Sequence, residues 1–183
     1  MSSIAGFVEK LAGPHWWTAA DYPDLPEELR CEIYLGGLRV VPAGSISHKV
    51  VSVELAESLR AAASDPWSVG RSIPVHAEDQ IFLPDVLVFR GDVGALPVSA
   101  VNVGLVVEVI DQENIERTVK MRAYAAAGIP AYLILDGEPG KRRAEVYGLV
   151  EGKYERTAFA AFDVPLSVEA PFSFVIDMSK INT

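Results

Sequence analysis

Two acidic residues inside apolar segments constrain the fold of this chain more than any other feature. Residues 83–89 read LPDVLVF and residues 104–110 read GLVVEVI, so Asp85 and Glu108 each stand in a run typical of a buried strand. An ionised carboxylate in such surroundings is costly unless a cation compensates its charge. Two of them in neighbouring strands therefore indicate a site.

The two strands are predicted to pair antiparallel. If residues 91–102 connect them, residues equally far from the middle of that connection face each other. Asp85 and Glu108 meet this condition, which places their Cβ atoms ~5 Å apart. Two carboxylates at that distance stay ionised only beside a cation. Ligation by oxygen alone favours Mg²⁺ or Mn²⁺ over zinc.

A helix is predicted over residues 112–127. Asp111 is its expected N-cap, while Gly128 and Pro130 end it. Its apolar face is formed by residues at helical spacing: Ile115, Val119, Ala123 and Ala126.

A second face of this helix carries Glu116, Lys120 and Tyr124, each four residues apart. If the helix returns along the strand before it, Glu108 lies roughly 10 Å below the strand's end. Lys120 then lies roughly 12 Å back along the helix, so its ammonium group can meet the two carboxylates. Two simpler interpretations stay open: an ion pair with Glu108 that is only structural, or a partner for Glu116 on a solvated face.

The order of these residues resembles the Uma-type restriction-endonuclease-like proteins of the PD-(D/E)XK nuclease superfamily. The resemblance spans about residues 25–150. It is carried by Pro84 with Asp85, by residues 106–110 (VVEVI), 116–130 (ERTVKMRAYAAAGIP) and 131–136 (AYLILD), and upstream by 32–37 (EIYLGG) and 45–48 (SISH).

The resemblance implies that Asp85, Glu108 and Lys120 are catalytic, that Asp85 and Glu108 hold Mg²⁺ or Mn²⁺, and that DNA is the substrate. The wider superfamily has lysine two residues after the glutamate, where this chain has Ile110. In the Uma-type pattern the lysine comes from the following helix, which here makes it Lys120.

The family pattern also makes Glu32 and His48 additional candidates for the site. From the residues alone, Glu32 lies on the polar face of a predicted strand and is expected to be exposed. His48 falls in the first turn of a predicted helix, where a surface histidine is expected. The three histidines have no metal-ligand spacing.

The predicted fold class is α/β, with a mixed sheet and a restriction-endonuclease-like core of helix, three strands, helix and strand. An N-terminal hairpin and C-terminal antiparallel strands extend this core. The expected hairpin covers residues 31–35 and 38–41, and a helix capped by Ser45 or Ser47 buries Val51, Leu55, Leu59 and Ala62. Further strands are expected around residues 72–78, 83–90, 103–110, 131–136, 143–150, 153–159 and 172–176.

Length and composition indicate a single domain over residues 1–183. A single cysteine, Cys31, excludes an intramolecular disulfide and fits a reducing compartment. The first residues lack the basic start and apolar core of a signal peptide. The longest apolar run, residues 123–135, is broken by glycine and proline and is too short to span a bilayer. We therefore expect a cytoplasmic protein without membrane association.

The net charge of −9 opposes nonspecific binding to a polyanion, since 16 basic residues stand against 25 acidic ones. The single basic cluster in the sequence is residues 141–143 (KRR), between two predicted strands. Its position favours a solvated hairpin turn over a phosphate contact.

Three functional hypotheses follow. The first is a metal-dependent endonuclease, expected as a homodimer because cutting both strands of a duplex takes two sites. The second is a catalytically inactive binding or assembly module with the same fold, which the acidic charge favours. The third is a structural homo-oligomer that uses Trp16, Trp17 and the C-terminal strands.

Overall fold

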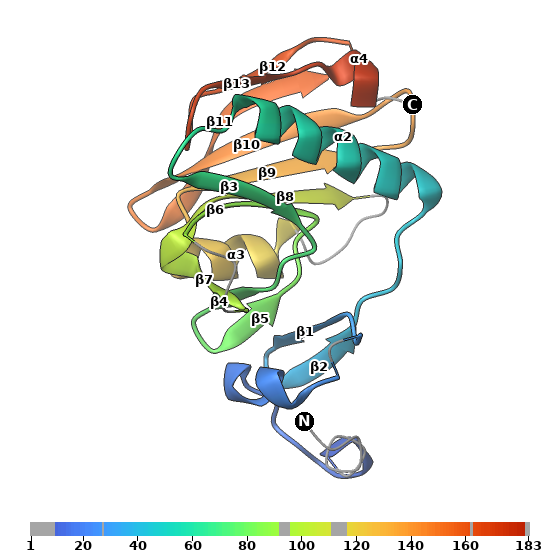
Figure 1. Ribbon diagram of the computed structural model, residues 1–183, viewed down its shortest axis with the longest axis vertical. Helices are drawn as coiled ribbons and strands as arrows, with labels where there is room; N and C mark the ends of the chain where they lie inside the picture. Colours follow the sequence, from blue (N-terminus) through green and yellow to red (C-terminus); the bar gives the residue numbers. More distant parts are fainter. Residues whose placement is uncertain (1–9, 27, 92–95, 111–116, 162, 182–183) are drawn as a thin grey trace.

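A six-stranded sheet forms the centre of the computed structural model, which describes residues 10–26, 28–91, 96–110, 117–161 and 163–181. The strand order is β11-β10-β9-β8-β6-β3, and only β8 and β9 run parallel (Figure 1). The strands are β3 (Trp67–Arg71), β6 (Val86–Arg90), β8 (Val103–Ile110), β9 (Ala131–Asp136), β10 (Arg143–Val150) and β11 (Lys153–Ala161).

The predicted register between β6 and β8 is confirmed. Val86 pairs with Val107, and Leu87 pairs with Val106. One further step along this antiparallel ladder places Asp85, which precedes β6, opposite Glu108 at the same end of the sheet.

Helix α2 (Ile46–Ala62) covers one face of this sheet. Its N-cap is Ser45, whose hydroxyl accepts a hydrogen bond from the His48 backbone N–H at 3.0 Å. Val51, Leu55 and Leu59 are fully buried against the sheet, as their spacing predicts, whereas Ala62 is exposed. The C-terminal segments complete this layer with β12 (Leu166–Val168), β13 (Phe174–Ile176) and α4 (Met178–Ile181).

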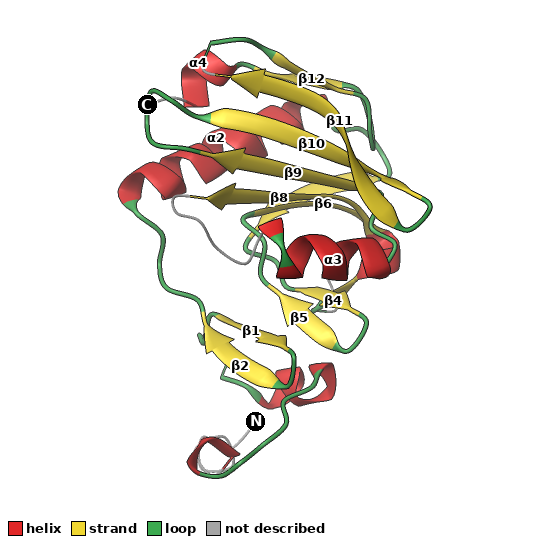
Figure 2. Ribbon diagram, turned by 180° about the vertical axis from the view of Figure 1, so that it is seen from behind, coloured by secondary structure: helices red, strands yellow, loops and turns green. Residues whose placement is uncertain are grey.

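Helix α3 (Val119–Ala126) and a second sheet cover the opposite face (Figure 2). The second sheet has the order β2-β1-β5-β4-β7. Its strands are β1 (Cys31–Tyr34), β2 (Gly37–Val40), β4 (Val75–Ala77), β5 (Gln80–Phe82) and β7 (Val98–Ser99), with the 3₁₀ helix η2 (Ala100–Asn102) following β7. Leu87, Phe89 and Val106 of the central sheet share this second core with Tyr124 and Tyr132.

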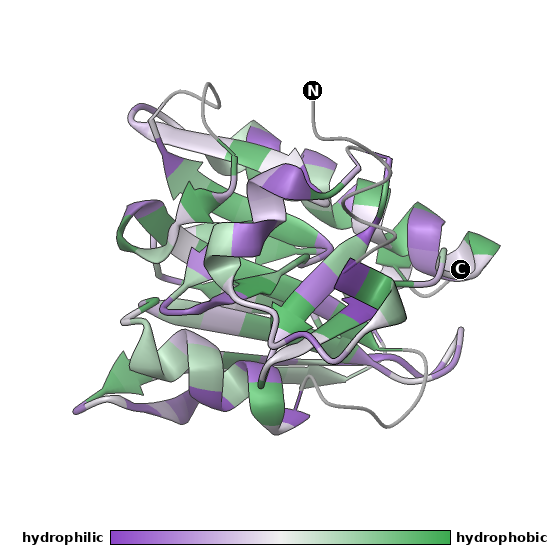
Figure 3. Ribbon diagram, turned by 90° about the horizontal axis from the view of Figure 1, so that it is seen from below, coloured by the Kyte–Doolittle hydropathy of each residue, from purple (hydrophilic) through white to green (hydrophobic). Residues whose placement is uncertain are grey.

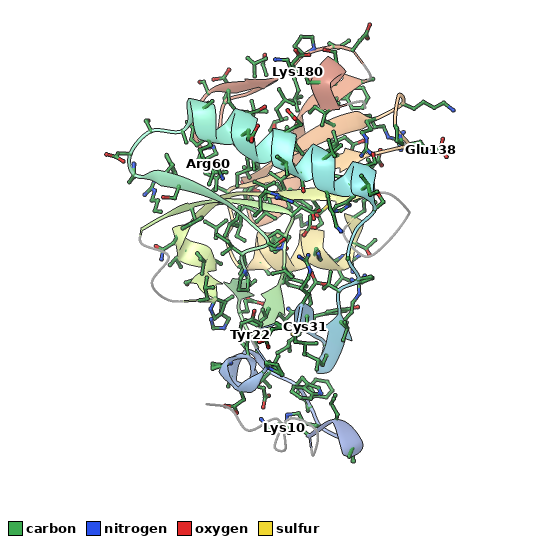
Figure 4. The ribbon with its side chains drawn as sticks, turned by 45° about the vertical axis from the view of Figure 1, so that its right-hand side comes forward. Lys10, Tyr22, Cys31, Arg60, Glu138 and Lys180 are labelled. Carbon is green, nitrogen blue, oxygen red and sulfur yellow. The ribbon has the colours of Figure 1, made fainter. Side chains whose placement is uncertain are left out.

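The predicted N-terminal hairpin is confirmed as β1 and β2. Its two turn residues, Leu35 and Gly36, have φ of 51° and 74°, as a tight hairpin turn requires. The 3₁₀ helix η1 (Ala19–Asp24) lies beside the hairpin, and Trp17 is buried in the same small core as Cys31. Figure 4 shows Tyr22 and Cys31 close together in this lower part of the molecule.

Several predicted strand boundaries are wrong, because a turn or a proline ends the strand within an apolar run. Of the strand expected at 72–78, only residues 75–77 form a strand, β4. Ser72 adopts a left-handed φ of 51° and separates β4 from β3, which lies in the other sheet. The strand expected at 83–90 is β6, which begins only at Val86, and Pro84 separates it from β5. The short strands β3, β5, β7 and β12 were not predicted.

The described part of the helix predicted over residues 112–127 is α3, which begins at Val119. Asp111 and the rest of residues 111–116 lie outside the described residues. The buried side of α3 carries Lys120 and Tyr124 with Ala123, whereas Ala126 of the predicted apolar face is exposed. The face of α3 that holds the candidate lysine therefore points toward the core.

None of the helices in the described part of the chain is long and apolar enough to cross a membrane. Hydrophobic residues instead follow the strands through the middle of the molecule, as seen from below in Figure 3.

Candidate active site

Lys120 joins two buried glutamates from separate elements. Its Nζ lies 2.9 Å from Oε1 of Glu108 on β8 and 2.7 Å from Oε1 of Glu32 on β1. The three residues are only 1–3% exposed. The helix geometry predicts the contact with Glu108, and Ile110, at the superfamily's usual lysine position, is buried in the apolar core instead.

The expectation that Glu32 is exposed is wrong. Its Oε1 also accepts a hydrogen bond from the Leu83 backbone N–H at 3.1 Å, and its Oε2 accepts one from Arg39 at 3.3 Å. Alternation along β1 correctly places Glu32 and Ile33 on opposite faces, but both faces are covered. Burial of Glu32 is possible because Lys120 and Arg39 both compensate its charge.

Asp85 lies where β6 begins, beside the N-terminus of α2. Its Oδ2 accepts a hydrogen bond from the Val109 backbone N–H at 2.8 Å, and its Oδ1 lies 2.7 Å from His48 Nε2. The His48 side chain is only 18% exposed, so the expectation of a surface histidine is wrong. The Ser45 cap fixes the first turn of α2 against this end of the sheet, which brings the imidazole to the carboxylate.

The electrostatics of the site centre on Glu108. The pKa of the Glu108 carboxyl is raised to about 8, mainly by burial. The negative charges of Asp85 and Glu32 contribute to this rise, and Lys120 opposes it. Tyr124 on α3 donates a hydrogen bond to Glu108 Oε1 at 3.1 Å. Burial and the nearby Glu108 raise the pKa of the Tyr124 hydroxyl, which keeps it a neutral donor. Its spacing of four residues from Lys120 was the signal for this contact.

A pocket of about 420 Å³ opens onto these residues. Besides the three carboxylates, Lys120 and His48, it is lined by cations from four separate segments: Arg30, Arg39, Lys49 and Arg71. The basic surface of the protein is therefore not confined to the cluster at residues 141–143. This second basic surface forms only when distant segments fold together, so no local run of basic residues in the sequence predicts it.

Residues 141 and 142 of the basic cluster lie in the turn between β9 and β10, as predicted, and Arg143 begins β10. The cluster is only partly solvated. Lys141 is exposed, whereas Arg142 is fully buried and donates to Ser47 Oγ at 2.6 Å. Arg143 pairs with Asp136. Asp136, which the sequence assigns only to shaping a turn, also pairs with Arg117 and so joins the approach to α3 to the sheet.

The site fits a divalent cation held by few protein ligands. No group of three or more His, Cys, Asp or Glu side chains in the described ranges could hold a metal ion. Asp85 and Glu108 nevertheless present carboxylate oxygens to one pocket from adjacent strands. Mg²⁺ commonly takes one or two carboxylates and completes its octahedron with water and substrate phosphate. After burial, the negative charges of Asp85 and Glu32 are among the causes that raise the pKa of Glu108, and a cation bound there would oppose them.

Among solved structures the fold is similar to that of "a putative nuclease belonging to DUF820" from Anabaena variabilis ATCC 29413. The TM-score is 0.67 and the sequence identity is 16%, over 90% of this chain and 96% of that one. Together with the mixed sheet and its helices, this likeness defines the class: a restriction-endonuclease-like fold, as predicted.

The chain belongs to the Uma2 family, described as "Putative restriction endonuclease", whose model matches residues 19–179. The family resemblance read from the sequence is thus confirmed. No curated protein matches the chain.

Proposed function

We propose that this protein is a metal-dependent endonuclease that hydrolyses DNA phosphodiester bonds, with Mg²⁺ or Mn²⁺ at Asp85 and Glu108. The observation that carries the proposal is the position of Lys120. Its ammonium group lies between Glu32 and Glu108, in a pocket that also contains Asp85. Membership of a family described as restriction endonucleases supports the same assignment.

A bound divalent cation would supply an activated water and would neutralise charge on the phosphate. Lys120 is placed to orient a water or to donate to a phosphate oxygen as negative charge develops there. Glu32 holds the Lys120 ammonium at 2.7 Å and so acts as a positioning residue. His48 does the same for Asp85, because its Nε2 lies 2.7 Å from the carboxylate.

The alternative is an inactive nuclease-fold module for binding or assembly. The buried contacts of Lys120 with Glu32 and Glu108 favour it, because such a group can serve the fold alone. The net charge of −9 also favours it.

A thermal-melting series with Mn²⁺ separates the two candidates. In the proposed enzyme, Mn²⁺ raises the melting temperature by mass action, and metal with plasmid or linear DNA gives cleavage that EDTA abolishes. Asp85→Asn removes one of the repelling charges, so the metal-free protein keeps its stability but loses the metal response and cleavage. Asp79→Asn is the matched control, because Asp79 is exposed in the turn between β4 and β5.

Lys120→Ala gives a different pattern. It leaves two buried carboxylates without their shared cation, so the metal-free protein loses about 3–5 kcal/mol of unfolding free energy. Metal binding persists while turnover falls. If Mn²⁺ leaves the wild-type melting temperature unchanged and no metal supports cleavage, the ion-pair group is structural and the inactive module is correct.

A further inference from the structure

We propose that the pocket admits a single unpaired DNA strand, so that the preferred substrate is single-stranded or locally unpaired DNA and not intact duplex. This inference rests on the proposed function and specifies its substrate. It follows from the depth of the site, the size of the pocket and the distribution of charge around it.

The reacting groups expose very little of their surface to solvent. Glu108 and Lys120 are each 3% exposed. Attack on a phosphate requires reacting atoms about 3–3.5 Å apart. A duplex holds each phosphate between fixed neighbours on a broad convex surface, so one phosphate cannot descend alone. An unpaired strand rotates about its backbone bonds and can insert one phosphate.

The pocket has the dimensions of a small-ligand site. Its volume of about 420 Å³ lies in the range of roughly 300–1,000 Å³ that accommodates small molecules. The connection from β2 to α2, residues 41–45, borders it, and Figure 1 shows this connection rising along one side of the molecule. Arg71, the last residue of β3, and Ser72 also line it. Such a space suits one nucleotide unit and not the width of a helix.

The rim of the pocket carries positive charge that the carboxylates of the described residues do not neutralise. Arg71 donates to Ser52 Oγ at 2.8 Å and Arg30 donates to Ser72 Oγ at 3.3 Å, so both guanidinium groups are held by hydroxyls. Neither forms an ion pair with a carboxylate in the described ranges, and both are exposed, as is Lys49. A single DNA strand that extends out of the pocket places its flanking phosphates beside these cations.

The contacts available in the pocket recognise the backbone and not the bases. No Phe, Tyr or Trp stands among the described residues that line it, so successive bases have no stacking platform there. Affinity for the DNA backbone would instead come from Arg30, Lys49 and Arg71. Because these cations contact phosphates, this affinity depends on salt concentration. With three phosphate contacts, the logarithm of the binding constant is expected to fall with slope about −2 against the logarithm of salt concentration.

Fluorescence anisotropy tests the inference without cleavage. The probe is a fluorescein-labelled 20-mer of mixed sequence, alone or annealed to its complement, with the wild-type protein in EDTA. We expect the single strand to bind at least tenfold more tightly than the duplex. Arg71→Ala should weaken binding of the single strand about threefold to tenfold, by analogy with single charge-assisted contacts. Arg122→Ala, an exposed arginine on α3 that does not line the pocket, should not change it.

Equal or tighter binding of the duplex overturns the inference, as does an Arg71→Ala variant that binds like Arg122→Ala. A cleavage assay with Mn²⁺ on both probes separates this inference from the proposed function. Preferred single-strand binding without cleavage supports the binding inference and refutes the nuclease. Faster cleavage of duplex than of single strand supports the nuclease and refutes the inference.

Discussion

At the scale of single residues, the site depends on how the charges of three carboxylates are compensated. Lys120 contacts Glu32 and Glu108, whereas Asp85 is held by His48 and a backbone N–H. The buried negative charge thus exceeds the positive charge of the lysine. Glu108 responds with a raised pKa, because burial penalises its ionised form most.

This imbalance predicts a pH-dependent stability. The pKa of Glu108 is about 8 in the folded protein against 4.5 in the unfolded chain, so the folded state binds more protons between these values. Its contribution to stability is therefore lost as pH rises from about 5 to 8, by at most about 1.4 kcal/mol per pH unit. Glu108→Gln cannot ionise, so its stability should not include this loss.

Urea unfolding of both proteins at several pH values between 5 and 9, without metal, measures the difference. The wild type should lose free energy of unfolding relative to Glu108→Gln as pH increases. Parallel curves for the two proteins would show that Glu108 is ionised throughout and that Lys120 fully compensates it.

At the scale of elements, the hairpin β1–β2 delivers Glu32 and Arg39 to the pocket, and its turn depends on Gly36. The φ of Gly36 is +74°, and a Cβ atom there would lie 2.4 Å from the Trp16 ring. Gly152, in the turn between β10 and β11, has φ of +77° with nothing within 4 Å of such an atom.

Comparison of two alanine variants isolates this contact. Gly152→Ala should cost about 1–2 kcal/mol, the ordinary penalty of a left-handed conformation for an L-residue. Gly36→Ala carries the same penalty and also displaces the Trp16 ring, so it should be less stable than Gly152→Ala in urea unfolding. Near-ultraviolet circular dichroism should report the displaced ring. Equal stability of the two variants would show that Trp16 does not restrain the hairpin.

At the scale of the whole molecule, the homodimer stays a prediction. Trp16, whose ring lies against Gly36, and Leu35, the residue before Gly36, are 71% and 72% exposed, and both offer apolar surface to a partner. Trp17, which the sequence pairs with Trp16 as a possible contact, is buried within the chain and cannot contribute.

Light scattering at tens of micromolar protein measures the mass directly. A homodimer gives twice the chain mass of 19.8 kDa. A Trp16→Ser variant should shift the equilibrium toward monomer, because it removes an apolar side chain from the exposed patch. A wild-type mass of one chain would argue against the dimer.

Much of the architecture could be predicted from local patterns. Apolar alternation and periodicity located β8, β9 and α2, and the symmetry of the connection between β6 and β8 gave their register. That register and the length of the helix placed Glu108 near Lys120. These predictions succeed because each depends on spacing within one segment or between sequence neighbours.

The rest required the tertiary structure. A local pattern states which side chains share a face, but not which distant segment covers that face. Glu32 is buried because α3 supplies Lys120 above it, and His48 meets Asp85 because α2 begins beside β6. The cations of the pocket rim likewise come from four separate segments that only folding brings together. The sequence therefore determined the acids and the lysine of the site. The tertiary structure decided which groups compensate their charges and which ligands can reach them.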